Sequence, residues 1–199
     1  MHNEYSAGTV KRMFWFVEYR KYVTLLRAGK SIDTIKALAS TENVFSASTP
    51  MRGRQIFSTV SARANGIPDS YNALFEHSAI ETQKLIVLIS IMNTDSLFLD
   101  FMNEVFREKM ITGDILLTDS DVRVFFLNKQ RESDKVAKWK DETLTRLGGC
   151  YKTYLVEAGL LERGVGSRKL TKPLLDSNLE TLLRETRMNH ILKILLGTR

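Results

Sequence analysis

The amino-acid sequence predicts a mainly α-helical protein with one short β-hairpin near its C-terminal end. Apolar side chains recur at helical spacing through most of the 199 residues, and cap residues and glycine terminators separate these segments. Only the stretch around residue 165 departs from this pattern, because short apolar segments flank a Gly-rich turn there. The chain is 43% hydrophobic and 26% charged, a composition typical of a globular protein with a buried core.

Two helices are predicted at the start of the chain. The first covers residues 10–28, whose apolar side chains lie on one helical face and are followed by Gly29 as a terminator. The second covers residues 32–40, because Ser31 is a favoured N-cap residue. A polar loop follows, so we expect this second helix to end well before Pro50.

A third helix is predicted over residues 51–65, because Pro50 stands at a favoured first-turn position. With the helix before it, residues 32–65 form a helix-turn-helix-like arrangement, in which the second helix can enter a major groove. The side chains that we expect to contact DNA phosphates and base edges from this helix are Arg52, Arg54, Gln55, Ser58 and Arg63. The alternative is a solvated basic helix face without a ligand.

The middle of the chain is predicted to form a helical scaffold. A short helix is predicted over residues 68–76, and Ser78 with Glu81 gives a capping-box signature before an apolar stretch that reaches Met92. The clearest helical periodicity lies over residues 95–110. We expect the apolar stretch to be a buried central helix.

The C-terminal part is predicted to begin with two longer helices. Thr118 and Asp121 mark the start of the first, and the second covers residues 141–158. Two shorter helices, which start near residues 177 and 190, close the chain.

A Gly-tipped β-hairpin is predicted after the second of these helices, between residues 160–162 and 169–171. A helix followed by such a hairpin resembles the recognition helix and wing of a winged-helix domain. The basic side chains that we expect to contact DNA from this helix and wing are Arg146, Lys152, Arg163, Arg168, Lys169 and Lys172. The alternative is an ordinary surface hairpin.

Two adjacent glycines, Gly148 and Gly149, lie inside the predicted helix 141–158. Each glycine destabilises a helix interior by roughly 1 kcal/mol relative to Ala. The absent side chain of Gly149 would let a DNA phosphate approach the helix backbone. A kink or tight packing against another helix explains the pair equally well.

Charged side chains divide the chain into two basic ends and an acidic middle. Residues 1–70 hold 10 basic and 5 acidic side chains, residues 71–134 hold 6 and 11, and residues 135–199 hold 13 and 7, giving +5, −5 and +6. Two basic surfaces around a scaffold suit a polyanionic ligand. The predicted parts are an N-terminal helix-turn-helix-like part over residues 1–70, a helical scaffold over residues 71–118 and a winged-helix-like domain over residues 119–199.

The sequence predicts neither a catalytic site nor a metal or cofactor site. The histidines are scattered and lack the spacing of a metal-binding pair; they are His2, His77 and His190. Asp114, Asp119 and Asp121 can in principle hold Mg²⁺, but two of them stand at a predicted helix start, where capping explains them better. The Gly-rich stretch 164–169 lacks the spacing of a phosphate-binding loop. We therefore expect no enzyme activity and no small-molecule substrate.

The single cysteine, Cys150, cannot form an internal disulfide, and we expect a reduced thiol in a cytoplasmic protein. No His or second Cys is placed to activate it as a nucleophile. No apolar run reaches the length of about 20 residues that a membrane helix needs, so we expect no membrane anchor.

Short segments along nearly the whole chain carry a family resemblance. They are Tyr5-Ser6-Ala7-Gly8, Thr49-Pro50 with the Arg-rich helix behind it, Ser96-Leu97-Phe98-Leu99-Asp100-Phe101, Trp139, Thr143, Leu147, Glu157-Ala158-Gly159-Leu160-Leu161 and Pro173. In these segments, and in the order of its elements, the sequence resembles the BrxA family of BREX bacteriophage-exclusion systems. The resemblance implies a compact, predominantly helical protein that binds double-stranded DNA and lacks a catalytic site. It gives no agreed set of DNA contacts, so the residues named above rest on charge and helix face.

The sequence thus predicts a non-catalytic, double-stranded DNA-binding component of a BREX phage-defence system, with other BREX proteins as further partners. Two alternatives remain open. Members of the family have been likened to NusB-type antitermination proteins, which makes RNA a competing ligand. The basic ends could instead contact acidic surfaces of larger defence subunits, in which case the protein is an adaptor.

Overall fold

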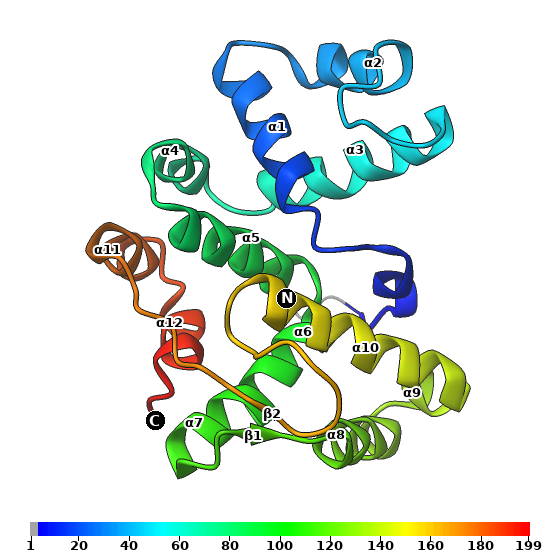
Figure 1. The fold of residues 1–199 in the computed structure, drawn as a ribbon, viewed down its shortest axis with the longest axis vertical. Helices are drawn as coiled ribbons and strands as arrows, with labels where there is room; N and C mark the ends of the chain where they lie inside the picture. Colours follow the sequence, from blue (N-terminus) through cyan, green and yellow to red (C-terminus); the bar gives the residue numbers. More distant parts are fainter. Residues whose placement is uncertain (1–3) are drawn as a thin grey trace. The chain divides into compact units, whose positions relative to one another are not determined.

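The computed structural model describes residues 4–199, and helices dominate it (Figure 1). The predicted mainly α-helical class is confirmed. Contacts divide the chain into an N-terminal unit, Phe14–Thr94, and a C-terminal unit, Asp95–Arg199 together with the residues up to Met13. The division into three parts that charge and motifs suggested stays a prediction.

The N-terminal unit is formed by five helices. They are α1 (Phe16–Arg27), α2 (Ile32–Thr41), α3 (Pro50–Asn65), α4 (Asp69–His77) and α5 (Ile80–Thr94). Every residue from 85 to 92 on α5 is buried, as expected for a helix that is apolar on all sides. A Cβ atom added to Gly53 would lie 2.5 Å from the Ala39 carbonyl oxygen, so the backbones of α2 and α3 pack closely at this glycine.

Local signals place the starts of α2 and α3 correctly, whereas the hydroxyl of Ser78, predicted to cap the next long helix, donates to the Leu74 carbonyl at 2.8 Å at the end of α4. The Ser31 hydroxyl accepts a hydrogen bond from the Thr34 backbone N–H, and the Thr49 hydroxyl accepts one from the Arg52 backbone N–H. Pro50 is the first residue of α3, where its missing N–H has no consequence.

The predicted first helix, 10–28, is wrong at its start. A short 3₁₀ helix, η1 (Ala7–Lys11), is followed by non-helical residues, and α1 begins only at Phe16. Trp15 has a left-handed backbone with φ 54°, and the side chains of Phe14 and Trp15 are buried. The chain leaves the C-terminal unit at this break.

The C-terminal unit holds the remaining elements around an aromatic core. They are η1, α6 (Ser96–Phe101), the π-helical segment η2 (Met102–Arg107), α7 (Glu108–Thr112), β1 (Leu116–Leu117), α8 (Asp119–Glu132), α9 (Asp134–Ala137), α10 (Asp141–Glu157), β2 (Arg168–Lys169), α11 (Ser177–Glu185) and α12 (Asn189–Leu196). The rings of Phe98, Phe101 and Phe126 surround Tyr151 of α10, at centroid distances of 5.0, 5.2 and 5.9 Å. These contacts fix α10 by its inner face.

The hairpin predicted after α10 is present, and a strand that the sequence did not predict joins it. Leu161 and Leu170 form an antiparallel bridge, and the Glu162 backbone N–H donates to the Lys169 carbonyl at 3.0 Å. On its other side, β2 pairs antiparallel with β1, with Leu116 opposite Lys169. The base of the Gly-rich turn is thereby held on both sides.

Candidate nucleic-acid interface

The outer face of α10 is a continuous polar surface. Leu147, Tyr151 and Tyr154 face the core, while Arg146 and Thr153 are exposed. Arg146 forms an ion pair with Glu142, one turn earlier, with 3.3 Å between nitrogen and oxygen and both side chains largely exposed. Such a solvent-exposed pair contributes little stability, so a stronger anion can replace the carboxylate.

The two glycines of α10 have different surroundings. A Cβ atom on Gly148 would lie 2.6 Å from Val122 Cγ1, so this glycine permits close packing of α10 against α8. A Cβ atom on Gly149 would have nothing within 4 Å, and Gly149 is exposed. The helix runs unbroken from Asp141 to Glu157 through both of them. Tight packing explains Gly148, whereas no intramolecular contact explains Gly149.

Residues 162–172 form a surface segment that we call the basic loop. Between Arg163 and Lys172 it contains no acidic residue. Arg163, Lys169 and Lys172 are exposed, and within residues 4–199 none of the three forms an ion pair. At the tip, Val165 is 95% exposed between two glycines with positive φ. With four basic residues and the acidic Glu162, the basic loop therefore has a formal charge of +3.

Asp119, the first residue of α8, links the basic loop to α10. Its carboxylate accepts a hydrogen bond from the Lys152 ammonium of α10 at 2.7 Å. This bond and the Lys152 charge lower the pKa of Asp119, and the charges of Arg168 and Arg123 lower it further. Cations from α10, β2 and α8 thus lie around one carboxylate. Neither the pair nor its position was predictable from the sequence, because 33 residues separate the partners.

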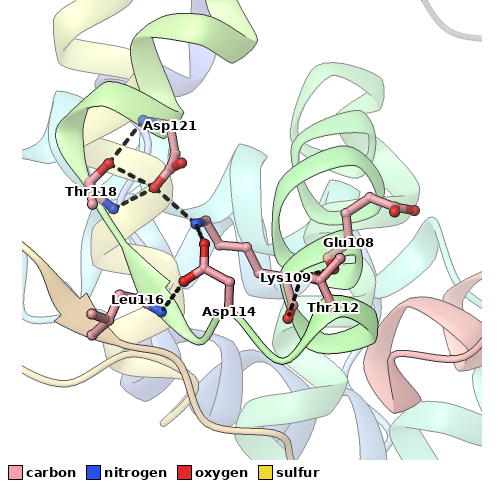
Figure 2. A network of polar contacts seen from close by, with 7 residues as sticks. All are labelled: Glu108, Lys109, Thr112, Asp114, Leu116, Thr118 and Asp121. Carbon is pink, nitrogen blue, oxygen red and sulfur yellow. Dashed lines mark hydrogen bonds and ion pairs between the residues drawn. The ribbon is translucent and has the colours of Figure 1, made fainter.

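The start of α8 is held by a polar network (Figure 2). The Thr118 and Asp121 side chains form a capping box, which confirms the predicted helix start. The Lys109 ammonium lies between the carboxylates of Asp114 and Asp121, at 2.8 and 3.1 Å. Partial burial disfavours the Lys109 charge, but these hydrogen bonds outweigh it and raise the pKa of Lys109. The network fixes the backbone that carries Asp119.

The aspartates considered for Mg²⁺ are engaged with lysines instead. Asp114 and Asp121 share Lys109, and Asp119 binds Lys152. In the part of the chain that the structure describes, no three His, Cys, Asp or Glu side chains form a group that could hold a metal ion.

In the N-terminal unit, the residues predicted on α3 do not share one surface. Arg54 and Ser58 are exposed. The Arg52 guanidinium lies over the Trp15 ring at 4.9 Å and donates a hydrogen bond to the half-buried Gln55 side chain at 2.6 Å. The exposed stripe of α3 therefore carries one formal charge.

Arg63 has a different role from the one predicted. Its side chain is 4% exposed, and its guanidinium donates a hydrogen bond to the Phe14 carbonyl at 2.8 Å. This contact fixes the non-helical residues before α1. A buried guanidinium bound to the backbone lies out of reach of DNA, so we leave Arg63 out of the candidate interface.

The connection between α2 and α3 is longer than a helix-turn-helix turn. It spans residues 42–49, where such motifs use three or four residues. The Asn43 side chain braces it by hydrogen bonds to the Ala47 backbone at 2.7 and 2.9 Å. The helix-turn-helix form of this region stays a prediction.

The candidate catalytic groups do not converge. His77 and His190 are exposed on different units, and partial burial raises the pKa of the Cys150 thiol, which disfavours the reactive thiolate. His2 lies outside the described residues. A groove of about 460 Å³ between α8 and α10 is lined by Phe126, Leu127 and Leu144 and by charged residues that include Asp119 and Lys152.

Known proteins match this chain along almost its full length. Residues 3–187 match the family model described as BrxA. The chain belongs to the BrxA family. A BREX protein BrxA from Bacillus cereus (strain H3081.97) is 39% identical over 193 residues, which cover 97% of this chain and 96% of that protein. The family resemblance predicted from the sequence is confirmed.

The fold of this BrxA family member also occurs in a solved structure. The crystal structure of an uncharacterized protein from Magnetospirillum magneticum matches with a TM-score of 0.81 and 17% identity, covering 98% of this chain and all of that one. At this identity the match shows a shared fold. Among the described residues, no single helix is long and apolar enough to cross a membrane; the broken pair Ile80–Thr94 and Ser96–Thr112 meets that test only when taken together.

Proposed function

We propose that this protein is a non-catalytic component of a BREX phage-defence system that binds double-stranded DNA through its C-terminal unit. Membership of the BrxA family supports the role in BREX phage defence. The observation that carries the DNA proposal is the basic loop with its cations Arg163, Arg168, Lys169 and Lys172. Helix α10 adds Arg146 and Lys152, which stand on a helix that also carries the acidic residues Asp141, Glu142 and Glu157. We call these six cations the basic surface.

The order of elements in the C-terminal unit supports this proposal. Helix α7 leads into β1, then come α8, the short α9 and α10, and then residues 160–162 and the basic loop, which contains β2, the partner of β1. Apart from the short α9, a winged-helix domain has this order. In such a domain the helix that precedes the wing enters the groove, and here that helix is α10. Its exposed face and the loop that follows it carry the cations.

Gly149 gives independent support. An exposed glycine inside a helix destabilises it by roughly 1 kcal/mol relative to Ala, and no neighbour within 4 Å requires it. A ligand backbone that approaches α10 closely at this position would require it. A DNA phosphate that packs against the helix surface is such a ligand.

Titration of the full chain with a fluorescent 25-base-pair duplex, at several salt concentrations, tests the proposal. Each phosphate neutralised contributes about −0.9 to the slope of log affinity against log salt, so contacts by about five cations give a slope near −4.5. A slope near zero, or no binding at low salt, would contradict it. Tighter binding to a matched RNA would favour the RNA alternative. The duplex should be recovered uncut and unmodified after incubation with Mg²⁺ and ATP.

A second function, contact with another protein, is favoured by a separate observation. Val124 and Leu127 lie about one turn apart on α8 and are each 52% exposed. Leu127 also lines the groove between α8 and α10. Co-purification with BREX proteins that survives nuclease treatment, and is lost on Leu127→Ser, would support this adaptor function beside DNA binding.

A further inference from the structure

Asp119 lies beside cations of the basic surface. Its carboxylate contacts the Lys152 ammonium at 2.7 Å, and Arg168 and Arg123 are close enough for their charges to act on it. The carboxylate thus has the charge and the hydrogen-bonding partner of a bound phosphate oxygen. Lys152 cannot offer its full charge to DNA while this pair is intact.

The exposure of the pair makes it displaceable. The Asp119 side chain is 60% exposed and the Lys152 side chain 24%. Ion pairs of this kind are typically worth less than about 1 kcal/mol, because water and salt compete with them. The buried Lys129 is a contrast, since it is 4% exposed and lies within 4 Å of the carboxylates of Asp100, Glu104 and Glu132. The Lys129 ammonium is therefore held by buried ion pairs, whereas the Lys152 ammonium can exchange the Asp119 carboxylate for another anion.

The backbone around Asp119 keeps its carboxylate in place. The capping box of Thr118 with Asp121 fixes the preceding residue, and Lys109 holds Asp121 from the other side (Figure 2). Asp119 takes part in neither contact, so the helix start does not need its charge for capping. Besides its favourable interaction with the dipole of α8, its carboxylate interacts with Lys152 of the basic surface.

We propose that Asp119 is an internal competitor of DNA phosphate that holds Lys152 in reserve and lowers the affinity of the C-terminal basic surface for duplex DNA. This inference rests on the proposed function. DNA that places a phosphate at Lys152 must displace the carboxylate. DNA that binds without displacing the Asp119 carboxylate gains no binding free energy from Lys152. Asp119 therefore favours DNA whose phosphate lies directly at Lys152 over DNA whose phosphates lie further away.

Removing the charge of Asp119 tests the inference on the full chain. Asp119→Asn should tighten duplex binding by roughly two- to fivefold, which corresponds to the free energy of an exposed ion pair. The slope of log affinity against log salt should steepen by about 0.9, because Lys152 becomes available to one more phosphate. Lys152→Met should weaken binding more in the Asp119→Asn background than in the unmodified chain.

Asp33→Asn is the matched control. Asp33 also lies in the first turn of a helix, α2, so both variants lose one negative charge and one favourable interaction with a helix dipole. An equal tightening in the two variants would overturn the inference, because net charge alone would then explain it. Unchanged or weaker binding by Asp119→Asn, with an unchanged melting temperature, would also overturn it. Absence of duplex binding by the unmodified chain would instead overturn the proposed function.

Discussion

Helix α3 of the N-terminal unit and helix α10 of the C-terminal unit are similar in sequence character and different in what they expose. Both carry basic residues between apolar positions, and both are followed by glycine. On α3, Arg63 is buried against the Phe14 carbonyl and Arg52 lies over Trp15, which leaves Arg54 as the exposed cation. On α10 and the basic loop, Arg146, Arg163, Lys169 and Lys172 are exposed, while Lys152 and Arg168 are partly buried. The comparison teaches that the tertiary fold decides which basic residues of a helix remain accessible at its surface.

Removing charge from the basic loop should have the largest effect. Arg163→Ala, Lys169→Ala and Lys172→Ala combined should weaken duplex binding roughly 30-fold at moderate salt and flatten the salt slope by about 2.7, if each cation contacts one phosphate. Arg52→Ala with Arg54→Ala should weaken it less than about threefold. Fluorescence anisotropy at four salt concentrations measures both. Equal losses of duplex affinity in the two variants would contradict the expectation that the C-terminal unit contributes more to DNA binding than the N-terminal unit.

The adjacent glycines of α10 should respond in opposite directions. Gly148→Ala should destabilise the protein by about 1–3 kcal/mol, because the new methyl group would meet Val122 at 2.6 Å. Gly149→Ala should stabilise it by up to about 1 kcal/mol and yet weaken duplex binding. Urea unfolding and anisotropy on the same samples give the two readouts. If Gly149→Ala left DNA affinity unchanged, close approach of DNA to this part of α10 would be refuted.

Arg63→Ala should lower the free energy of unfolding without changing the affinity for duplex DNA. Loss of the buried guanidinium leaves the Phe14 carbonyl without this donor, and a buried unsatisfied polar group costs about 1–3 kcal/mol. The midpoint of urea unfolding should fall, while the salt slope of duplex binding at native conditions stays the same. If Arg63→Ala flattened the slope of log affinity against log salt without lowering the free energy of unfolding, Arg63 would belong to the DNA interface.

The pH dependence of stability should be the smallest effect. Partial burial works against the charge of Asp121, but its hydrogen bonds with Thr118 and Lys109 outweigh burial and lower the pKa of Asp121. An unfolded Asp titrates near pH 3.9. The contribution of Asp121 is therefore complete above about pH 4 and is lost as the pH falls through its lower folded value. Melting temperatures between pH 2.5 and 6 should fall less steeply at the acid end for Asp121→Asn than for the unmodified chain.

Local signals were predictable from the sequence, and long-range contacts were not. The signals at Ser31, Pro50 and Thr118 act within the first turn of a helix, so their patterns identified the helix starts. Neither the pairing of β1 with β2 nor the bond from Asp119 to Lys152 leaves such a pattern, because tertiary folding brings these residues together.

Arg63 and Gly149 show the same limit for the candidate interface. Helical spacing placed Arg63 away from the apolar stripe, but the chain before α1 covers that side and buries it. The glycine pair suggested either packing or close approach, and only the surroundings of each glycine separate the two explanations.

Affinity of the full chain for a 25-base-pair duplex, with and without the three substitutions in the basic loop and across salt concentrations, tests the central claim most directly. We predict salt-sensitive binding whose slope loses more than half its magnitude when Arg163, Lys169 and Lys172 are replaced by Ala, with the melting temperature unchanged. An unchanged slope in that variant would contradict the claim that the C-terminal unit provides the DNA-binding surface.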